Sequence, residues 1–422
     1  MTGTALFSLF ALLLLLRVPI AIALAGSTII IFMLTSSFAP EAITQRIFSS
    51  LDNTTIMAIV GFVFAGIVMA RGGISKYLIE SLRAWVGHLP GGLAIVTTGA
   101  CMIFAAISGS SPATAAAIGT IMIPAMVEAG YSKRFAMGLV AASGTLGILI
   151  PPSVPMMMFG VTAEESIGKL FTAGIVPGIL LGFTLMAAAV IYSKLHKYKV
   201  LPKADWPTRW RTTVKAIWGY LFPVLILYII YSGIATPTET AVISSVYAVI
   251  VSAFIYRELG WKDIRPILQE TVTTSAMIYL IIAAAHVFGM YLTINQIPQL
   301  VANWVIEKNL SVWMFFLLVN IMFFIMGAFL ESLAIIVITL PILLPIIKEL
   351  GINIYHFAIV MIVNMELAMI TPPVGLNLFV VSGIAREKLG EAVKGVAQFI
   401  VIMIAVLIVL VIFPQISLVL LE

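Results

Sequence analysis

A polar stretch, residues 108–114 with the sequence SGSSPAT, carries groups that can bind a small anion. Ser is favoured as the residue that caps a helix and Pro is favoured in the first turn, so Ser111 and Pro112 predict a helix start. The first N–H groups of a helix have no intrahelical partner and carry partial positive charge. A helix start of this kind, facing a cavity, can hold a carboxylate.

The apolar flanks of this stretch, residues 94–106 and 115–126, are each shorter than the roughly 20 helical residues that cross a bilayer. The stretch alone allows two interpretations: one span kinked at the serines, or a hairpin that enters the membrane and leaves on the same side. Backbone without helical hydrogen bonds survives at membrane depth only where it is buried in protein or lines a cavity.

Three further breaks interrupt apolar runs, at residues 327–332 (GAFLES), 150–153 (IPPS) and 370–377 (ITPPVGLN). Proline removes an N–H group and pushes the preceding residue out of the helical conformation, which leaves nearby carbonyls unpaired. Carbonyl and hydroxyl oxygens at such ends can replace the hydration shell of Na⁺. Tight helix packing, with each hydroxyl bonded back to its own chain, is the alternative for any single Ser or Thr.

Two acids fall inside the apolar segments, Glu331 at the second tip and Glu366 before the last break. An acid at membrane depth is costly and is a functional candidate by default. Glu331 can bind a substrate group, hold a cation or carry a proton; alternatively it lies at a wet tip without a fixed role. His286 is expected to be a hydrogen-bonded packing residue, and the single cysteine, Cys101, a small core residue.

Composition indicates a polytopic, mostly helical membrane protein: 62% of the 422 residues are hydrophobic and 10% are charged, and the mean hydropathy is +1.15. A soluble domain carries about a quarter charged residues. The formal net charge of +5 is expected in cytoplasmic loops and does not indicate nucleic-acid binding. No Walker loop, nucleophile elbow, HExxH or dinucleotide fingerprint is present, so the sequence does not predict an enzyme or an organic cofactor.

The remaining apolar segments are predicted spans, the first of which is retained rather than cleaved as a signal peptide. The first segment is either one kinked span or two short ones, because Arg17 and Pro19 interrupt it. Residues 74–86 are predicted to form an amphipathic helix at the membrane surface. The predicted spans are residues 6–34, 55–69, 175–192, 217–234, 241–256, 277–292 and 396–421.

A basic connector, residues 194–215, lies between the two halves of the chain, with seven Lys or Arg residues against the single acid Asp205. Trp206 and Trp210 lie among them, as aromatic anchors at the headgroup level would. We predict a cytoplasmic, surface-lying segment.

The two halves repeat at an offset of 221 residues. The two proline breaks match, and so do an upstream proline, an upstream glycine and the last serine of each tip: Pro151 with Pro372, Pro152 with Pro373, Pro124 with Pro345, Gly130 with Gly351 and Ser111 with Ser332. Repeated halves with broken segments at matching positions are typical of secondary transporters and favour the hairpin interpretation.

We therefore predict an all-α fold of two repeats, which are inverted if each half has an odd number of crossings. The first repeat is residues 1–193, with a re-entrant hairpin at about 93–126 and a broken helix at about 135–165. The second repeat is residues 216–422, with a hairpin at about 312–348 and a broken helix at about 357–385.

Three motifs, residues 108–115 (SGSSPATA), 144–153 (GTLGILIPPS) and 371–377 (TPPVGLN), resemble the large membrane subunit (DctM-like) of the tripartite ATP-independent periplasmic (TRAP) transporters. The resemblance implies Na⁺-coupled import of an organic acid, of the C4-dicarboxylate or sialic acid type, as a multi-pass protein of a bacterial inner membrane. It implies an elevator mechanism, with a scaffold mainly of residues 1–85 and 216–295 and a transport domain mainly of residues 90–190 and 310–420. It also implies two partners, a small four-helix membrane subunit and a periplasmic substrate-binding protein.

The resemblance assigns site residues to the four breaks. Substrate is expected between the tips, at Ser108, Ser110, Thr114, Ser153, Glu331 and Asn377. A first Na⁺ site is expected at Ser108, Gly109, Ser111, Gly144, Gly147 and Pro151. A second is expected at Gly327, Glu331, Ser332, Met365, Glu366, Thr371 and Pro372. Sialic acid members carry Asp where this chain has Glu331, and this departure leaves the substrate open.

Two other classes of membrane protein have different requirements. A stand-alone divalent-anion/Na⁺ symporter of similar two-hairpin architecture would work without partner proteins. An intramembrane protease would need a pair of aspartates within spanning segments, or a paired nucleophile and base, and the sequence has no such aspartate pair.

Overall fold

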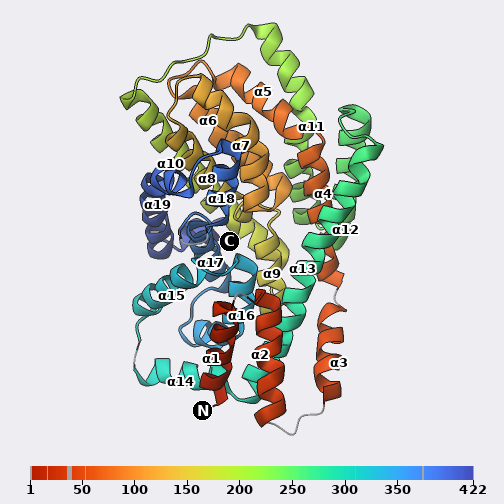
Figure 1. Ribbon diagram of the computed structural model, residues 1–422, viewed down its shortest axis with the longest axis vertical. Helices are drawn as coiled ribbons and strands as arrows, with labels where there is room; N and C mark the ends of the chain where they lie inside the picture. The colour runs from red at the N-terminus through yellow and green to blue at the C-terminus, as the bar shows by residue number, and fades with distance from the viewer. Residues whose placement is uncertain are drawn as a thin grey trace.

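The computed structural model describes residues 2–16, 18–35, 40–52, 54–308, 310–372 and 375–421, and these residues form helices joined by short connections (Figure 1). The first half contains α1 (Thr2–Leu15), α2 (Ile20–Thr35), α3 (Pro40–Leu51), α4 (Thr54–Arg71), α5 (Ile74–Val86), α6 (Gly92–Ser108), α7 (Ser111–Glu128), α8 (Lys133–Thr145), η1 (Leu146–Ile148), α9 (Val154–Ala163) and α10 (Ile167–Leu195). The second half contains α11 (Trp206–Tyr231), α12 (Pro237–Val249), η2 (Ile250–Ile255), α13 (Trp261–Ile294), α14 (Ile297–Glu307), α15 (Val312–Gly327), α16 (Ser332–Glu349), α17 (Ile354–Ala368), α18 (Leu376–Ala385), α19 (Leu389–Ile412) and α20 (Gln415–Leu418).

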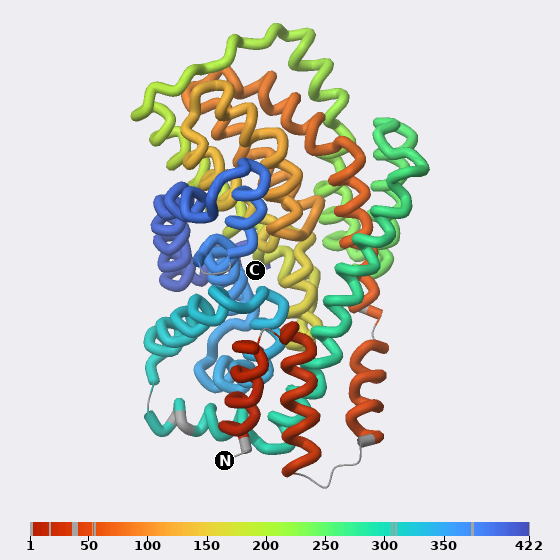
Figure 2. Tube along the Cα trace, in the orientation of Figure 1, coloured from red at the N-terminus to blue at the C-terminus, as the bar shows by residue number. Residues whose placement is uncertain are grey.

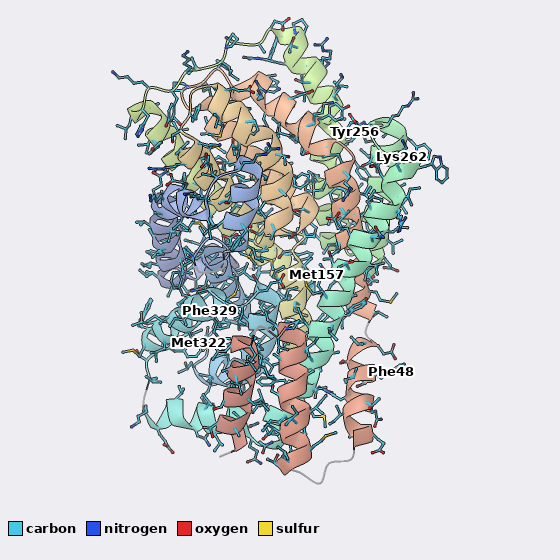
Figure 3. The ribbon with its side chains drawn as sticks, viewed as in Figure 1. Phe48, Met157, Tyr256, Lys262, Met322 and Phe329 are labelled. Carbon is cyan, nitrogen blue, oxygen red and sulfur yellow. The ribbon has the colours of Figure 1, made fainter. Side chains whose placement is uncertain are left out.

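Six helices among the described residues are long and apolar enough to cross a membrane, or seven if the bent pair Glu41–Leu51 and Ile56–Arg71 counts as one span. Large apolar side chains also cover the outside, where Phe48 on α3 is 76% exposed (Figure 3). An exposed apolar surface of this kind suits a hydrocarbon environment. The predicted all-α polytopic membrane fold is confirmed.

Both predicted hairpins are present as helix pairs, α6–α7 and α15–α16, each followed by a broken helix, α8–η1–α9 and α17–α18. Helix α16 begins and ends 221 residues after α7, which agrees with the offset found in the sequence. That the hairpins re-enter the membrane, and that the halves are inverted, stay predictions.

The helices gather into two packed groups (Figure 2). In one, α4 packs along α12, and α13 packs against α2, α3 and α4. Gly61 permits the α4–α12 contact, because a Cβ built there would lie 2.8 Å from Ala241 Cβ. In the other group, α8 packs between α7 and α19, and α18 packs on α7.

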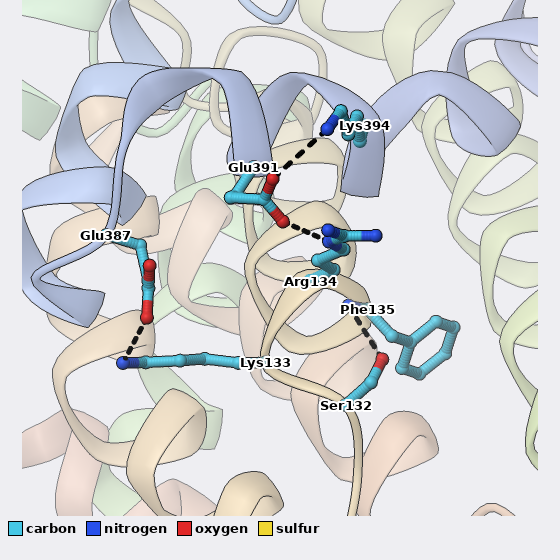
Figure 4. Close-up of polar contacts among 7 residues, drawn as sticks. All are labelled: Ser132, Lys133, Arg134, Phe135, Glu387, Glu391 and Lys394. Atoms are coloured by element: carbon cyan, nitrogen blue, oxygen red, sulfur yellow. Dashed lines mark hydrogen bonds and ion pairs between the residues drawn. The ribbon is translucent and has the colours of Figure 1, made fainter.

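Ion pairs tie the two halves together within the second group (Figure 4). Lys133 Nζ lies 2.9 Å from Glu387 Oε1, and Arg134 pairs with Glu391, which also accepts from Lys394. Ser132 begins α8 by accepting a hydrogen bond from Phe135 N–H. First-half helix α8 is thereby joined to the segment between α18 and α19 and to the first turn of α19.

Three predicted segments can be compared with the structure. Residues 6–34 form the second of the two predicted alternatives, two short helices, α1 and α2, that pack on each other; Arg17, at the predicted break, lies outside the described residues. Within the connector, residues 206–215 are the first turns of α11, begun by Asp205 as N-cap with proline in the first turn. Helix α13 begins at Trp261, well before residue 277, with Asp263 in its first turn, where an acid is favourable.

Candidate functional site

A cavity of about 440 Å³ lies where the two hairpin tips meet helices α4 and α13. Each of these elements contributes one face. The lining residues are Val63, Gly66, Ile67, Ala70 and Arg71; Ser108, Gly109, Ser110, Ser111, Pro112, Ala113 and Ala116; Ile148, Val154 and Pro155; Glu270, Thr274, Met277 and Ile278; Glu331, Ser332 and Leu333; and Met369 and Val380.

The first tip presents a helix start to this cavity. Helix α6 ends at Ser108, Gly109 turns the chain with a positive φ of 59°, and Ser110 is the N-cap of α7. The sequence predicted Ser111 as the cap; this was one residue off, because Gly109 makes the turn and Ser111 is already helical. The Ser110 side chain makes no capping hydrogen bond, and it lines the cavity.

The other polar groups of the first tip hold the turn together. Ser108 Oγ lies 2.7 Å from Thr114 Oγ1, and Thr114 Oγ1 donates to Ser110 O at 2.8 Å. Thr114 is fully buried and is not among the lining residues, so its hydroxyl orders the tip. Of these groups, Ser108 and Ser110 reach the cavity.

Asn377 lies behind the tip rather than in the cavity lining. Its Nδ2 donates to Ser111 Oγ at 2.8 Å and to Ala141 O at 2.9 Å, and the side chain is fully buried. Ser153 is also buried; its Oγ donates to Ile148 O at 2.6 Å and accepts from Met156 N–H at the start of α9. Both side chains support the site from outside the cavity.

The residues expected at the first Na⁺ site come together where the first tip meets the broken helix. A Cβ built at Gly147 would lie 2.5 Å from Ser110 O, and one built at Gly144 would lie 3.1 Å from Ala115 Cα. Gly109 O accepts from Val154 N–H at 3.4 Å. Pro151 lies in the turn after η1. The glycines are required here, because any side chain would separate the tip from η1.

The second tip carries the acid. Glu331 is the N-cap of α16 and, like Ser110, makes no capping hydrogen bond with its side chain. Ser332 is buried, and no partner is found for its Oγ in the described part of the chain. Gly327, Glu331 and Ser332 line a second cavity of about 210 Å³ together with Ala368 and Met369 at the end of α17.

Four residues expected at the second Na⁺ site do not line either cavity. Met365 and Glu366 are fully buried, and neither carboxylate oxygen of Glu366 has a partner among the described residues. Thr371 Oγ1 donates back to Leu367 O at 2.6 Å. Pro372 follows it, and residues 373–374 lie outside the described residues.

Two charged residues that the sequence did not predict for the site line the larger cavity, Arg71 at the end of α4 and Glu270 on α13. Arg71 Nη2 lies 2.8 Å from Glu270 Oε2. In the sequence Arg71 marked only the end of a predicted span, and no pattern joined it to an acid 199 positions away. His286 is the packing residue expected, since its Nδ1 lies 2.9 Å from Ile282 O.

The described residues contain no group of three or more His, Cys, Asp or Glu side chains that could hold a metal ion.

Residues 7–416 match the family described as "Tripartite ATP-independent periplasmic transporter, DctM component". The chain belongs to the DctM family. It is 44% identical to the C4-dicarboxylate TRAP transporter large permease protein DctM of Pseudomonas aeruginosa, over 90% of each chain. It is 42% identical to the isethionate TRAP transporter permease protein DctMQ of Oleidesulfovibrio alaskensis, over 97% of this chain and 65% of that protein.

A more distant DctM-family relative is the sialic acid TRAP transporter large permease protein SiaM of Vibrio cholerae, 34% identical over 96% of this chain and 95% of that protein. The crystal structure of the YdaH transporter of Alcanivorax borkumensis is similar in fold alone, with a TM-score of 0.64 at 13% identity over 97% of this chain and 98% of that one. These DctM-family relatives are named as transporter permeases, not enzymes.

Proposed function

We propose that this chain is the transport subunit of a Na⁺-coupled importer of a small organic acid, of the C4-dicarboxylate or sialic acid type. The observation that carries the proposal is the meeting of two helix N-termini, those of α7 and α16, at one cavity. One is capped by a serine without a capping hydrogen bond and the other by an acid.

The first tip supplies the anion contact. The free N–H groups at the start of α7 and the hydroxyls of Ser108 and Ser110 bind an acid group of the substrate. Glu331 lines the same cavity, and its ionised carboxylate would repel that anion at close range. A bound cation at the second tip removes this repulsion, so substrate binding and cation binding support each other.

The oxygen atoms at the two hairpin tips are suitable ligands for Na⁺. The first site is assigned to the tip of α6–α7 and its contact with η1, where Ser110 O lies 2.5 Å from a Cβ built at Gly147 and Ile148 O accepts from Ser153 Oγ. The second is assigned to Glu331 and Ser332 with the end of α17, where the Ser332 hydroxyl and the Glu366 carboxylate, which have no partner among the described residues, supply oxygens. The coupling ion is the only cofactor proposed.

The two packed groups of helices form the scaffold and the moving transport domain of an elevator. The ion pairs of Lys133 and Arg134 support this division, because they join both halves of the moving group. A small four-helix subunit and a periplasmic binding protein complete the importer in a bacterial inner membrane. The match of this chain to 65% of the relative named DctMQ is consistent with a second component fused in that protein.

Reconstitution tests this function. Proteoliposomes that hold the chain with its small subunit and binding protein are expected to take up succinate, isethionate or N-acetylneuraminate when an inward Na⁺ gradient is applied, but not with K⁺. Omission of the binding protein is expected to abolish uptake. Undiminished uptake by the chain alone would instead support the stand-alone symporter.

A further inference from the structure

Arg71 and Glu270 form the wall of the cavity that faces the first hairpin tip. Val63, Gly66, Ile67 and Ala70 lie one turn or less apart on a single face of α4, and Arg71 ends this stripe. On α13, Glu270, Thr274 and Met277 likewise share one face toward the same cavity, on which Ser108 and Ser110 also open.

The ion pair between these residues leaves the guanidinium available. Arg71 uses Nε and Nη2, at 3.3 and 2.8 Å, on the single oxygen Oε2 of Glu270. The two side chains are 41% and 49% exposed. Exposed pairs of this kind stabilise a protein little, and a guanidinium carries five N–H donors in a planar fork that fits a carboxylate or a sulfonate.

Arg71 lies toward the end of the molecule that holds the basic connector. Helix α5 follows it directly and packs on α11, whose first turns carry Arg209 and Arg211 (Figure 1). Excess basic charge predicts that this end is cytoplasmic. An acid that leaves the first tip on this side meets Arg71.

We propose that Arg71 is a release-side anion site on the scaffold, which binds the acid group of the substrate as it leaves Ser108 and Ser110. Glu270 competes for the same guanidinium, so it frees the substrate into the cytoplasm and restores Arg71 for the next cycle. The ligand class is a small organic carboxylate or sulfonate. The proposal rests on the proposed function, and it adds a second anion contact on the helix group opposite the tips.

The hypothesis that this ion pair is purely structural predicts a different result. If the pair only joined α4 to α13, the loss of either partner would have the same consequence. In an anion site the two residues act in opposite directions, because Arg71 attracts the substrate and Glu270 displaces it.

The test measures how strongly internal substrate inhibits import in the three-component proteoliposomes. Succinate, isethionate and N-acetylneuraminate are tried in this order, and the first that the unaltered complex imports is the probe. The probe is loaded inside the vesicles at increasing concentration. Arg71→Gln is expected to raise the half-inhibiting internal concentration about tenfold, the size of one lost charge-assisted hydrogen bond. Glu270→Gln is expected to lower it, and Arg71→Lys, which keeps the charge but not the planar fork, to restore part of the affinity.

A matched ion pair serves as the control. Lys76 on α5 and Glu258 before α13 lie 3.4 Å apart, are similarly exposed, and do not line the cavity. Glu258 raises the pKa of Lys76 above its usual value, so the Lys76 ammonium keeps its charge at neutral pH. Lys76→Gln and Glu258→Gln are expected to leave the internal inhibition unchanged.

Shifts in the same direction for Arg71→Gln and Glu270→Gln, or no shift in either, would overturn the anion site. If Arg71→Gln does not insert into the membrane, Glu270→Gln and Arg71→Lys are compared instead. The anion site is refuted if internal substrate inhibits import by the Glu270→Gln variant no more strongly than import by the unaltered protein. Absence of import by the unaltered complex would be a failure of the proposed function instead.

Discussion

At the scale of single residues, the two tips place different chemistry in matching positions. Ser110 and Glu331 are both N-caps, 221 residues apart, and both face the larger cavity. A hydroxyl leaves the partial positive charge of its helix free for an anion, whereas a carboxylate neutralises that charge and favours a cation. The same backbone geometry therefore supports an anion contact in one half and a cation contact in the other.

Asn377 gives a prediction at this scale. Asn377→Ala removes the donor to Ser111 Oγ and Ala141 O in a fully buried place, so we expect a loss of about 1–3 kcal/mol in the free energy of unfolding. Unfolding of the purified protein in detergent measures it. Ser166→Ala, at the exposed cap of α10, is the comparison. Unchanged stability with lost uptake would instead restore the substrate role that the sequence suggested.

At the scale of elements, the packing of α4 against the first hairpin depends on one glycine. A Cβ built at Gly66 would lie 3.1 Å from both Cα and O of Ser108, backbone atoms of the tip itself. The tip therefore lies directly on α4, with no side chain between them.

We expect Gly66→Val to push the tip away from α4 and to reduce Na⁺-driven uptake at least about tenfold, because a tip displaced by 1 Å loses its binding geometry. Insertion and expression should be retained. Gly289→Val on α13 is the control, since no atom lies within 4 Å of a Cβ at that position. Normal uptake by Gly66→Val would show that the tip can move aside without cost.

The elements that the sequence predicted well are those with local signals. Helix α5 has the bounds expected from its spacing of apolar and charged residues, and the prolines and glycines marked all four breaks. What could not be predicted depends on packing between distant segments. The bond from Asn377 to Ser111 and the pair of Arg71 with Glu270 join residues 266 and 199 positions apart, and no local pattern specifies either.

At the scale of the whole molecule, the connector between α10 and α11 lies at one end and α14 at the other (Figure 2). Lys199 is part of that connector. We expect Lys199→Cys in intact cells to react with a thiol reagent only after the reagent gains access to the cytoplasm. A cysteine at Lys308, just after α14, is the opposite-end comparison. Labelling of position 199 from the periplasm would reverse the orientation and place Arg71 on the uptake side.

The solitary cysteine has a practical consequence for measuring motion. Cys101 lies on α6 and is fully buried, so thiol-reactive probes should not reach it in the folded protein. The natural chain therefore adds no reactive thiol of its own to a labelling experiment. A pair of spin labels, one introduced on α13 and one on α19, would report the distance between the two helix groups as Na⁺ and substrate are added, without prior removal of any native residue.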